Sequence, residues 1–179
     1  RNLMSMDTEE MLRAQPMDAC VLIGGCDKTV PAQVMGGISA DVPIIQLVTG
    51  PMLTGSFRGE RVGACTDCRR FWASYRAEDL NDNDIEEVNN QLVPTVGTCG
   101  VMGTASTMAI TTEVLGLMVP NSACAPAVSA DRKRIAEKTG EISVKIANEN
   151  LKPSKFLNEK SFMNALIVLS AIGGSTNGV

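Results

Sequence analysis

Two short apolar runs decide the fold: DACVLIG at residues 18–24 and PIIQLVT at residues 43–49, with TVPAQVMGGISA at residues 29–40 between them. Both runs are rich in aliphatic residues and are followed closely by glycine, which is typical of buried strands. The middle segment opens with a threonine cap and an early proline, so we expect a helix there in spite of its glycine pair. Strand, helix and strand in this order predict a parallel α/β unit.

The sequence around this unit predicts further helices. The acidic DTEE at residues 7–10 is expected to cap an opening helix. Helical patterns follow at residues 82–92, 104–117, 126–138, 141–150 and 159–172. With no internal repeat, low-complexity tract or linker, we expect residues 1–179 to be part of one domain. The expected fold class is α/β, a parallel sheet flanked by helices in three α/β/α layers, and incomplete.

Composition excludes several classes of function. The chain of 179 residues is 44% hydrophobic with only four Phe, one Trp and one Tyr, and its net charge is −4, which argues against nucleic-acid binding. It contains no histidine, so histidine-dependent triads, HExxH sites and histidine-ligated zinc cannot be built from these residues. No apolar run approaches the ~20 residues of a membrane span. Any chemistry must therefore use Cys, Asp, Glu, Lys or Ser.

The first candidate site is GGCDKT at residues 24–29, which joins the first predicted strand to the following helix. Ligands of open α/β sheets bind at such positions. One interpretation is an ordinary glycine-rich turn with a buried cysteine and a solvated Asp-Lys pair. The other is a site that gathers the thiolate of Cys26, the carboxylate of Asp27 and the amine of Lys28, in which sulfur suits iron and oxygen suits magnesium.

The second candidate site is PTVGTCGVMGTAST at residues 94–107, where glycines precede a helix with the spacing G-x-x-G-x-x-G. A phosphate cradle is the competing interpretation, because helix amides can hold an anion. The spacing matches neither the dinucleotide-binding nor the P-loop pattern. Cys99, flanked by Gly97 and Gly100, instead offers sulfur close to backbone amides, as iron–sulfur ligation favours.

The remaining cysteines are harder to interpret. Cys65 and Cys68 form a C-x-x-C, which is compatible with zinc or with a redox pair, although structural zinc needs four ligands. Cys20 and Cys124 are expected to be small core residues. The arginines that follow the pair are expected to form a solvated face, from which an anionic substrate could recruit one; they are Arg69, Arg70 and Arg76.

GCDK at residues 25–28, PTVGTCG at 94–100 and GGSTN at 173–177 occur in this order, and with them the chain resembles the dihydroxy-acid dehydratase and phosphogluconate dehydratase family. PAVSADR at residues 126–132 supports the resemblance, which covers essentially the whole chain. Enzymes of this family remove water from 2,3-dihydroxy carboxylic acids and give 2-keto acids. They use an iron–sulfur cluster and a magnesium ion.

The resemblance implies roles for particular residues. Cys26 and Cys99 are expected to be two of three cluster cysteines, with [2Fe-2S] favoured over [4Fe-4S]. Asp27 is expected to be a magnesium ligand, and Lys28 a second one that some members carry as a carbamate. Magnesium would hold the substrate carboxylate and 2-hydroxyl, while the open iron accepts the 3-hydroxyl. The implied substrate pocket contains Thr104, Ser175, Thr176 and Asn177.

Further expectations follow from the same resemblance. The chain should be an internal fragment of the N-terminal domain that lacks the C-terminal domain and is inactive alone, with one cluster cysteine and one acidic magnesium ligand before Arg1. The catalytic base, a serine, and another magnesium ligand are expected beyond Val179. We expect a small-molecule acid as substrate, no nucleic acid or membrane partner, and a homo-oligomer, dimer or tetramer. The expected compartment is the cytoplasm, or mitochondria in a eukaryote.

Two questions stay open at this point. GACTDCRRFW at residues 63–72 looks more like the sugar-acid (aldonate, arabinonate-type) dehydratases than the branched-chain enzymes. Its polar side chains could serve several substrate hydroxyls; they are Thr66, Asp67, Arg69 and Arg70. The rival class is a non-enzymatic α/β ligand-binding or thiol redox-sensing domain that uses Cys65 and Cys68, with Cys26 and Cys99 merely buried.

Overall fold

The central unit is the predicted pair of parallel strands with a crossover helix. The structure is a computed structural model that describes residues 1–64 and 66–179. Strand β1 (Cys20–Gly24) pairs in parallel with β2 (Ile44–Val48), so that Cys20 lies opposite Ile44 and Gly24 opposite Val48. Helix α2 (Thr29–Ala40) connects them. The α/β fold class is confirmed.

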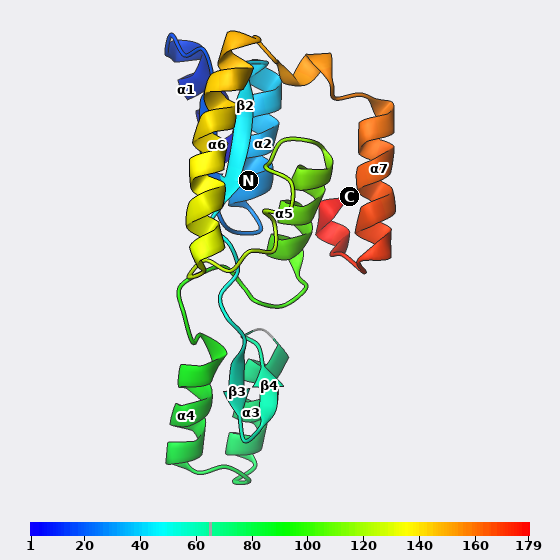
Figure 1. Cartoon of the computed structure of the whole chain (residues 1–179). Helices are drawn as coiled ribbons and strands as arrows, with labels where there is room; N and C mark the ends of the chain where they lie inside the picture. Colours follow the sequence, from blue (N-terminus) through cyan, green and yellow to red (C-terminus); the bar gives the residue numbers. More distant parts are fainter. Residues whose placement is uncertain (65) are drawn as a thin grey trace.

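Helices cover both faces of this sheet and form three layers (Figure 1). On one face, Leu22 and Ile44 pack in a cluster that includes residues of α2 and of α5 (Thr104–Val114). On the other face, Val21 and Ile45 pack against residues of α6 (Ala130–Asn148). Neighbouring strand residues thus point to opposite layers, which explains why both runs are almost continuously apolar.

The glycine pair in α2 allows this helix to lie between two close neighbours. A Cβ on Gly36 would lie 2.5 Å from the carbonyl oxygen of Ser5 in α1 (Asn2–Ala14). A Cβ on Gly37 would lie 2.6 Å from Cδ1 of Ile44 in β2. Glycine lowers helix propensity, but here its missing side chain lets α1 and the sheet approach the two sides of α2.

Residues 55–92 form a second body, which we call the small lobe (Figure 1). It contains β3 (Gly55–Phe57), β4 (Glu60–Val62), α3 (Thr66–Arg76) and α4 (Asp82–Leu92). Its core is a separate hydrophobic cluster of Phe57, Val62, Phe71, Ile85, Val88 and Leu92. The antiparallel hairpin of β3 and β4 was not among the predicted elements. Assignment of residues 1–179 to one domain stays a prediction.

Several predicted helix boundaries need correction. Helix α1 already begins at Asn2, so the acidic DTEE lies inside it and does not cap it. The two helices expected at residues 126–138 and 141–150 are the single helix α6, because Gly140 is accommodated within it. Ser129 caps α6 and its Oγ accepts the amide of Arg132, which leaves residues 126–129 outside the helix. Helix α5 ends at Val114, before the predicted end.

The chain ends in α7 (Glu159–Ala171), close to its predicted range, and short 3-10 helices flank it at Pro153–Lys155 (η1) and Thr176–Gly178 (η2). Helix α7 packs on α5, and η2 packs on the same helix. Among the described residues, no helix combines the length and apolar character needed to cross a bilayer. The end of the chain is therefore brought against α5, whose first turn carries predicted site residues.

Candidate functional site

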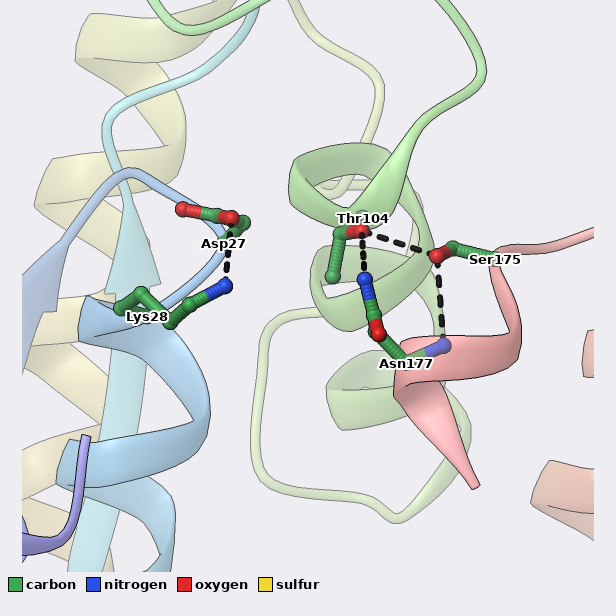
Figure 2. Close-up of polar contacts among 5 residues, drawn as sticks. All are labelled: Asp27, Lys28, Thr104, Ser175 and Asn177. Atoms are coloured by element: carbon green, nitrogen blue, oxygen red, sulfur yellow. Dashed lines mark hydrogen bonds and ion pairs between the residues drawn. The ribbon is translucent and has the colours of Figure 1, made fainter.

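The turn after β1 presents three of the predicted site residues at the start of α2. Cys26 is exposed, and its carbonyl oxygen accepts the amide of Val30 at 3.2 Å, which begins the helix. Lys28 Nζ donates to Asp27 Oδ2 at 2.8 Å (Figure 2). The side chain of Lys28 is 58% exposed and that of Asp27 is 41% exposed, so the ion pair is only weakly stabilising and opens easily.

The electrostatics of this turn favour an ionised carboxylate. The hydrogen bond from the Lys28 side chain lowers the pKa of Asp27, and hydrogen bonds from the Cys26 side chain and the Lys28 backbone act in the same direction. Desolvation opposes the shift without reversing it. Asp27 is therefore a charged oxygen donor at neutral pH, of the kind that a hard cation prefers.

The segment that carries Cys99 lies beside this turn. Thr98 forms a parallel bridge with Pro51, and its amide donates to the carbonyl oxygen of Gly50 at 2.9 Å. A Cβ on Gly25 would lie 3.0 Å from Cγ2 of Thr98, so the Gly25 backbone lies close to the Thr98 side chain. Cys26 and Cys99 each directly follow a residue of this contact. The structure thus brings together two loops that are far apart in the sequence.

The predicted pocket residues meet at the first turn of α5. Thr104 Oγ1 donates to Ser175 Oγ at 2.9 Å, and Asn177 Nδ2 donates to Thr104 Oγ1 at 3.4 Å (Figure 2). The amide of Ser175 donates to Oγ1 of Thr107, a fully buried residue, at 2.9 Å. These bonds fix the GGSTN segment on α5. Thr176 lies exposed in η2.

Asp27, Lys28 and Asn177 line one cleft of about 600 Å³, together with the first residues of α1. In Figure 2 the Asp27–Lys28 pair and the Thr104, Ser175 and Asn177 group lie on separate elements, and Asn177 is the member of the second group that lines the cleft. The cleft therefore combines an ionised carboxylate, an amine and a side-chain amide. Such a set can hold the carboxylate and hydroxyl groups of a small polar acid.

The side chains at this site are of the types that bind iron and magnesium, but they supply only some of the ligands that a metal site needs. Cys26 offers soft sulfur and Asp27 hard oxygen, which match iron and magnesium respectively. In the part of the chain that the structure describes, no three Cys, Asp or Glu side chains come close enough to hold a metal ion together. These residues would contribute some ligands of a metal centre, and other residues would have to complete it.

The cysteines outside this region have different surroundings. Cys65 lies outside the described residues, so its pairing with Cys68 is not described. Cys68 is half-buried beside the core of the small lobe. Burial raises the pKa of the Cys20 thiol, which packs against the main core as expected. Cys124 is exposed, and its assignment to the core was wrong because it lies in an irregular loop at the surface.

The polar residues of α3 mainly serve the small lobe. Arg70 bonds to Asp67 Oδ1 and to Glu60 Oε2, both at 3.0 Å, and Asp67 Oδ2 accepts the amide of Gly63 at 2.8 Å. These contacts tie the hairpin to the helix. Arg69, Arg70 and Arg76 are exposed, as expected for a solvated face, and Thr66 is exposed as well.

Two charged residues near the sheet were missed by sequence reasoning. The carboxylate of Glu113 accepts the amides of Asn121, Ser122 and Ala123 at 2.7, 3.0 and 2.7 Å. Arg132 is 8% exposed and donates to the carbonyl oxygens of Val48 and Ser122 at 2.8 and 2.9 Å, and also to that of Ala125. The sequence signal was a charged residue within a motif that otherwise contains small and apolar residues.

Comparison with known proteins agrees with the geometry. The family model for the N-terminal region of dihydroxy-acid/6-phosphogluconate dehydratases matches residues 1–179. Over 100% of its length the chain is 44% identical to L-arabinonate dehydratase of Rhizobium leguminosarum bv. trifolii, and it covers 31% of that protein. Over 99% of its length it is 37% identical to 6-deoxy-6-sulfo-D-gluconate dehydratase of Pseudomonas putida and to dihydroxy-acid dehydratase of Methanococcus maripaludis, covering 31% and 32% of them.

The chain thus spans about a third of the length of these curated relatives. The match includes the turn after β1, the segment around Cys99 and the GGSTN segment, since all three lie within the matched residues. The chain therefore belongs to the dihydroxy-acid/6-phosphogluconate dehydratase family, and corresponds to its N-terminal region.

Proposed function

We propose that this chain is the N-terminal part of a hydro-lyase that converts a 2,3-dihydroxy carboxylic acid into a 2-keto acid. The observation that carries the proposal is the meeting of three segments: the Cys26–Lys28 turn, the Thr98–Cys99 segment and the docked GGSTN segment. Family membership supports the same class of reaction. A base for the C2 proton would come from residues outside this chain.

Within this proposal, Cys26 and Cys99 bind an iron–sulfur cluster, with [2Fe-2S] favoured, and Asp27 and Lys28 bind magnesium. When bound, these groups supply Lewis acidity for the leaving hydroxyl and positive charge for the substrate carboxylate. Asp27 supports the assignment because it is ionised at neutral pH beside an exposed cysteine. Lys28 would become a carbamate: its ammonium nitrogen bonds carbon dioxide and releases two protons, which exchanges a cation for oxygen donors.

The substrate is proposed to be a sugar acid, with a branched-chain dihydroxy acid second. Asn177 lines the cleft, and its side-chain amide is hydrogen-bonded to the hydroxyl of Thr104, which donates to Ser175; a polyhydroxy acid can exchange hydrogen bonds with such polar groups, whereas a branched aliphatic chain cannot. The 44% identical relative named L-arabinonate dehydratase points the same way. Asp67 and Arg70 tie the hairpin of the small lobe to α3 and do not line the cleft, so we base the proposal on the cleft rather than on the small lobe.

We further propose a homo-oligomer, a dimer or tetramer, and a cytoplasmic location, mitochondrial in a eukaryote. Exposed apolar side chains support assembly: Leu3 and Met6 of α1 are 71% and 62% exposed, and Ile167 of α7 is 60% exposed. Apolar side chains of this size gathered on helices are frequent at subunit interfaces. Light scattering of the full-length protein would give the number of subunits.

The cluster assignment is tested in the full-length protein purified without oxygen. Cys26→Ser and Cys99→Ser should each remove visible colour and most of the iron, because an alcohol is a poor replacement for a thiolate ligand. Cys68→Ser is the matched control and should keep both. If both single variants retained full iron and turnover, the assignment would be wrong; a colourless wild type impaired by Cys68→Ser would favour a thiol redox domain.

The magnesium and substrate assignments have separate tests. Lys28→Arg should lose most activity, because arginine keeps the charge but cannot form a carbamate. Near-wild-type turnover of this variant would leave Lys28 as an ordinary surface cation. For the substrate, kcat/KM is compared between pentonic or hexonic acids and a branched 2,3-dihydroxy acid. A preference for the branched acid by about tenfold, or about 1.4 kcal/mol, would refute the sugar-acid assignment alone.

A further inference from the structure

Arg132 is a buried cation whose partners are backbone carbonyls. It is 8% exposed, and within the described part of the chain its guanidinium bonds to Val48, Ser122 and Ala125 oxygens and to no carboxylate. Its buried Nε has no hydrogen-bond partner among the described residues. Burial lowers the pKa of this guanidinium, although arginine remains protonated. A buried charge without an opposite charge is costly, so its presence here points to a geometric role.

The carbonyls that Arg132 holds lie at the carboxyl end of β2, next to the segment that carries Cys99. Val48 is the last residue of β2, and Gly50 follows with φ 88°. A Cβ on Gly50 would lie 2.8 Å from Nε of Arg132, so the backbone there rests on the guanidinium. The carbonyl oxygen of Gly50 in turn accepts the amide of Thr98, the neighbour of Cys99.

A second connection runs through the loop before α6. Ser122 and Ala125, which give carbonyls to Arg132, belong to this loop. Further along the same loop, the amide of Ala127 donates to the carbonyl oxygen of Pro51 at 2.9 Å, and Pro51 is the residue bridged to Thr98. The guanidinium therefore bonds both to the end of β2 and to the loop before α6, and these two attachments flank the Gly50–Pro51 backbone.

We propose that Arg132 is a positioning residue for Cys99: its guanidinium fixes the Gly50–Pro51 backbone against which the Thr98–Cys99 segment pairs. The inference rests on the proposed function insofar as Cys99 is a cluster ligand. Without the guanidinium, the carbonyls of Val48, Ser122 and Ala125 lose their shared donor, and the pairing with Thr98 loses its support. The Cys99 thiol would then sample more orientations and more solvent.

The test uses Arg132→Met and Arg132→Lys in the full-length protein, with Arg134→Met as matched control. Arg134 lies on the same helix, is 71% exposed and pairs with Asp131. The first readout is the alkylation rate of Cys99 in the iron-free protein, followed by peptide mass spectrometry with Cys68 as internal reference. The second is iron content after reconstitution. A third is the circular dichroism spectrum, which reports whether each variant folds.

We expect Cys99 to be alkylated about tenfold faster in Arg132→Met, which corresponds to a shift of about 1.4 kcal/mol in local opening. Arg132→Lys should lie between, because one ammonium replaces the guanidinium fork less completely. Iron content should fall in the same order, and Arg134→Met should match the wild type. Because the first readout needs no iron, faster alkylation with unchanged iron would support the positioning role and overturn the cluster assignment.

Two results would overturn the inference itself. The first is a folded Arg132→Met whose Cys99 alkylation and iron content equal those of Arg134→Met. The second is loss of the folded spectrum in both Arg132 variants, because a residue that only positions Cys99 should leave the rest of the fold intact.

Discussion

The carboxylate of Glu113 should be a major anchor of the loop that follows α5. Replacing it by alanine removes the acceptor of three backbone amides. Asn121 is exposed and its amide can turn to water, but Ser122 and Ala123 are 1% and 8% exposed. Each buried amide left without a partner costs about 1–3 kcal/mol, so Glu113→Ala should lower the free energy of unfolding by roughly 2–6 kcal/mol.

Glutamine at this position separates hydrogen bonding from charge. Oε2 of Glu113 accepts the two buried amides and Oε1 accepts that of Asn121. A glutamine can place its carbonyl oxygen where Oε2 of Glu113 accepts the two buried amides, and point its amino group towards exposed Asn121. Glu113→Gln should therefore cost only about 1 kcal/mol, much less than Glu113→Ala.

Urea unfolding of the full-length protein, followed by circular dichroism, measures both variants. The matched control is Glu141→Ala, since Glu141 is a 58% exposed residue of α6 that pairs with Lys138. The midpoint for Glu113→Ala should lie well below that of the control at an unchanged slope. Equal midpoints for the two alanine variants would refute the reasoning, and so would a glutamine variant as unstable as the alanine variant.

Two other substitutions follow from the packing and the charges. Gly37→Ala should lower the free energy of unfolding by about 1–3 kcal/mol because its Cβ would meet Ile44. Gly140→Ala, whose Cβ would have nothing within 4 Å, should raise the free energy of unfolding by about 0.5–1 kcal/mol. A higher urea midpoint for Gly37→Ala than for Gly140→Ala would contradict this packing. Hydrogen bonds from Ser154 lower the pKa of Asp41, so the wild type should be more stable than Asp41→Asn at pH 7 and lose that advantage as the pH falls below about 4. If the difference in free energy of unfolding between the wild type and Asp41→Asn were the same at pH 3 and pH 7, this prediction would be wrong.

The parallel unit was predictable from the sequence because both strands are apolar runs bounded by glycine or proline, although β2 is mostly buried while Ile23 of β1 is exposed. The hairpin of the small lobe was not, because strands of three residues are too short to show an alternating pattern. Its turn residues Arg58 and Gly59 have φ of 49° and 85°. This conformation suits hairpin turns, but an arginine in the sequence seldom predicts it. Gly140 misled in the other direction, because a single glycine does not end a helix with strong neighbours.

For the candidate site, local motifs predicted Cys26, Asp27 and Cys99, which stays a prediction, but they did not indicate which residues surround and support these three. The contact between Arg132 and Val48 joins residues 84 positions apart and uses a backbone carbonyl, which every residue possesses. Because the acceptor in such a bond is a backbone carbonyl, no particular side chain in the sequence indicates the partner. Only the fold reveals that Arg132 and Glu113 hold the same loop.

The small lobe leaves the main body after Pro51 and returns at Thr98, and these two residues are bridged. Its two attachment points therefore lie side by side, so we expect the main body to tolerate a change in the length or content of the residues between them. The small lobe is therefore an insertion into the α/β body. Chimaeras joined at Pro51 and Thr98 would exchange the small lobe while keeping the α/β body and its candidate site.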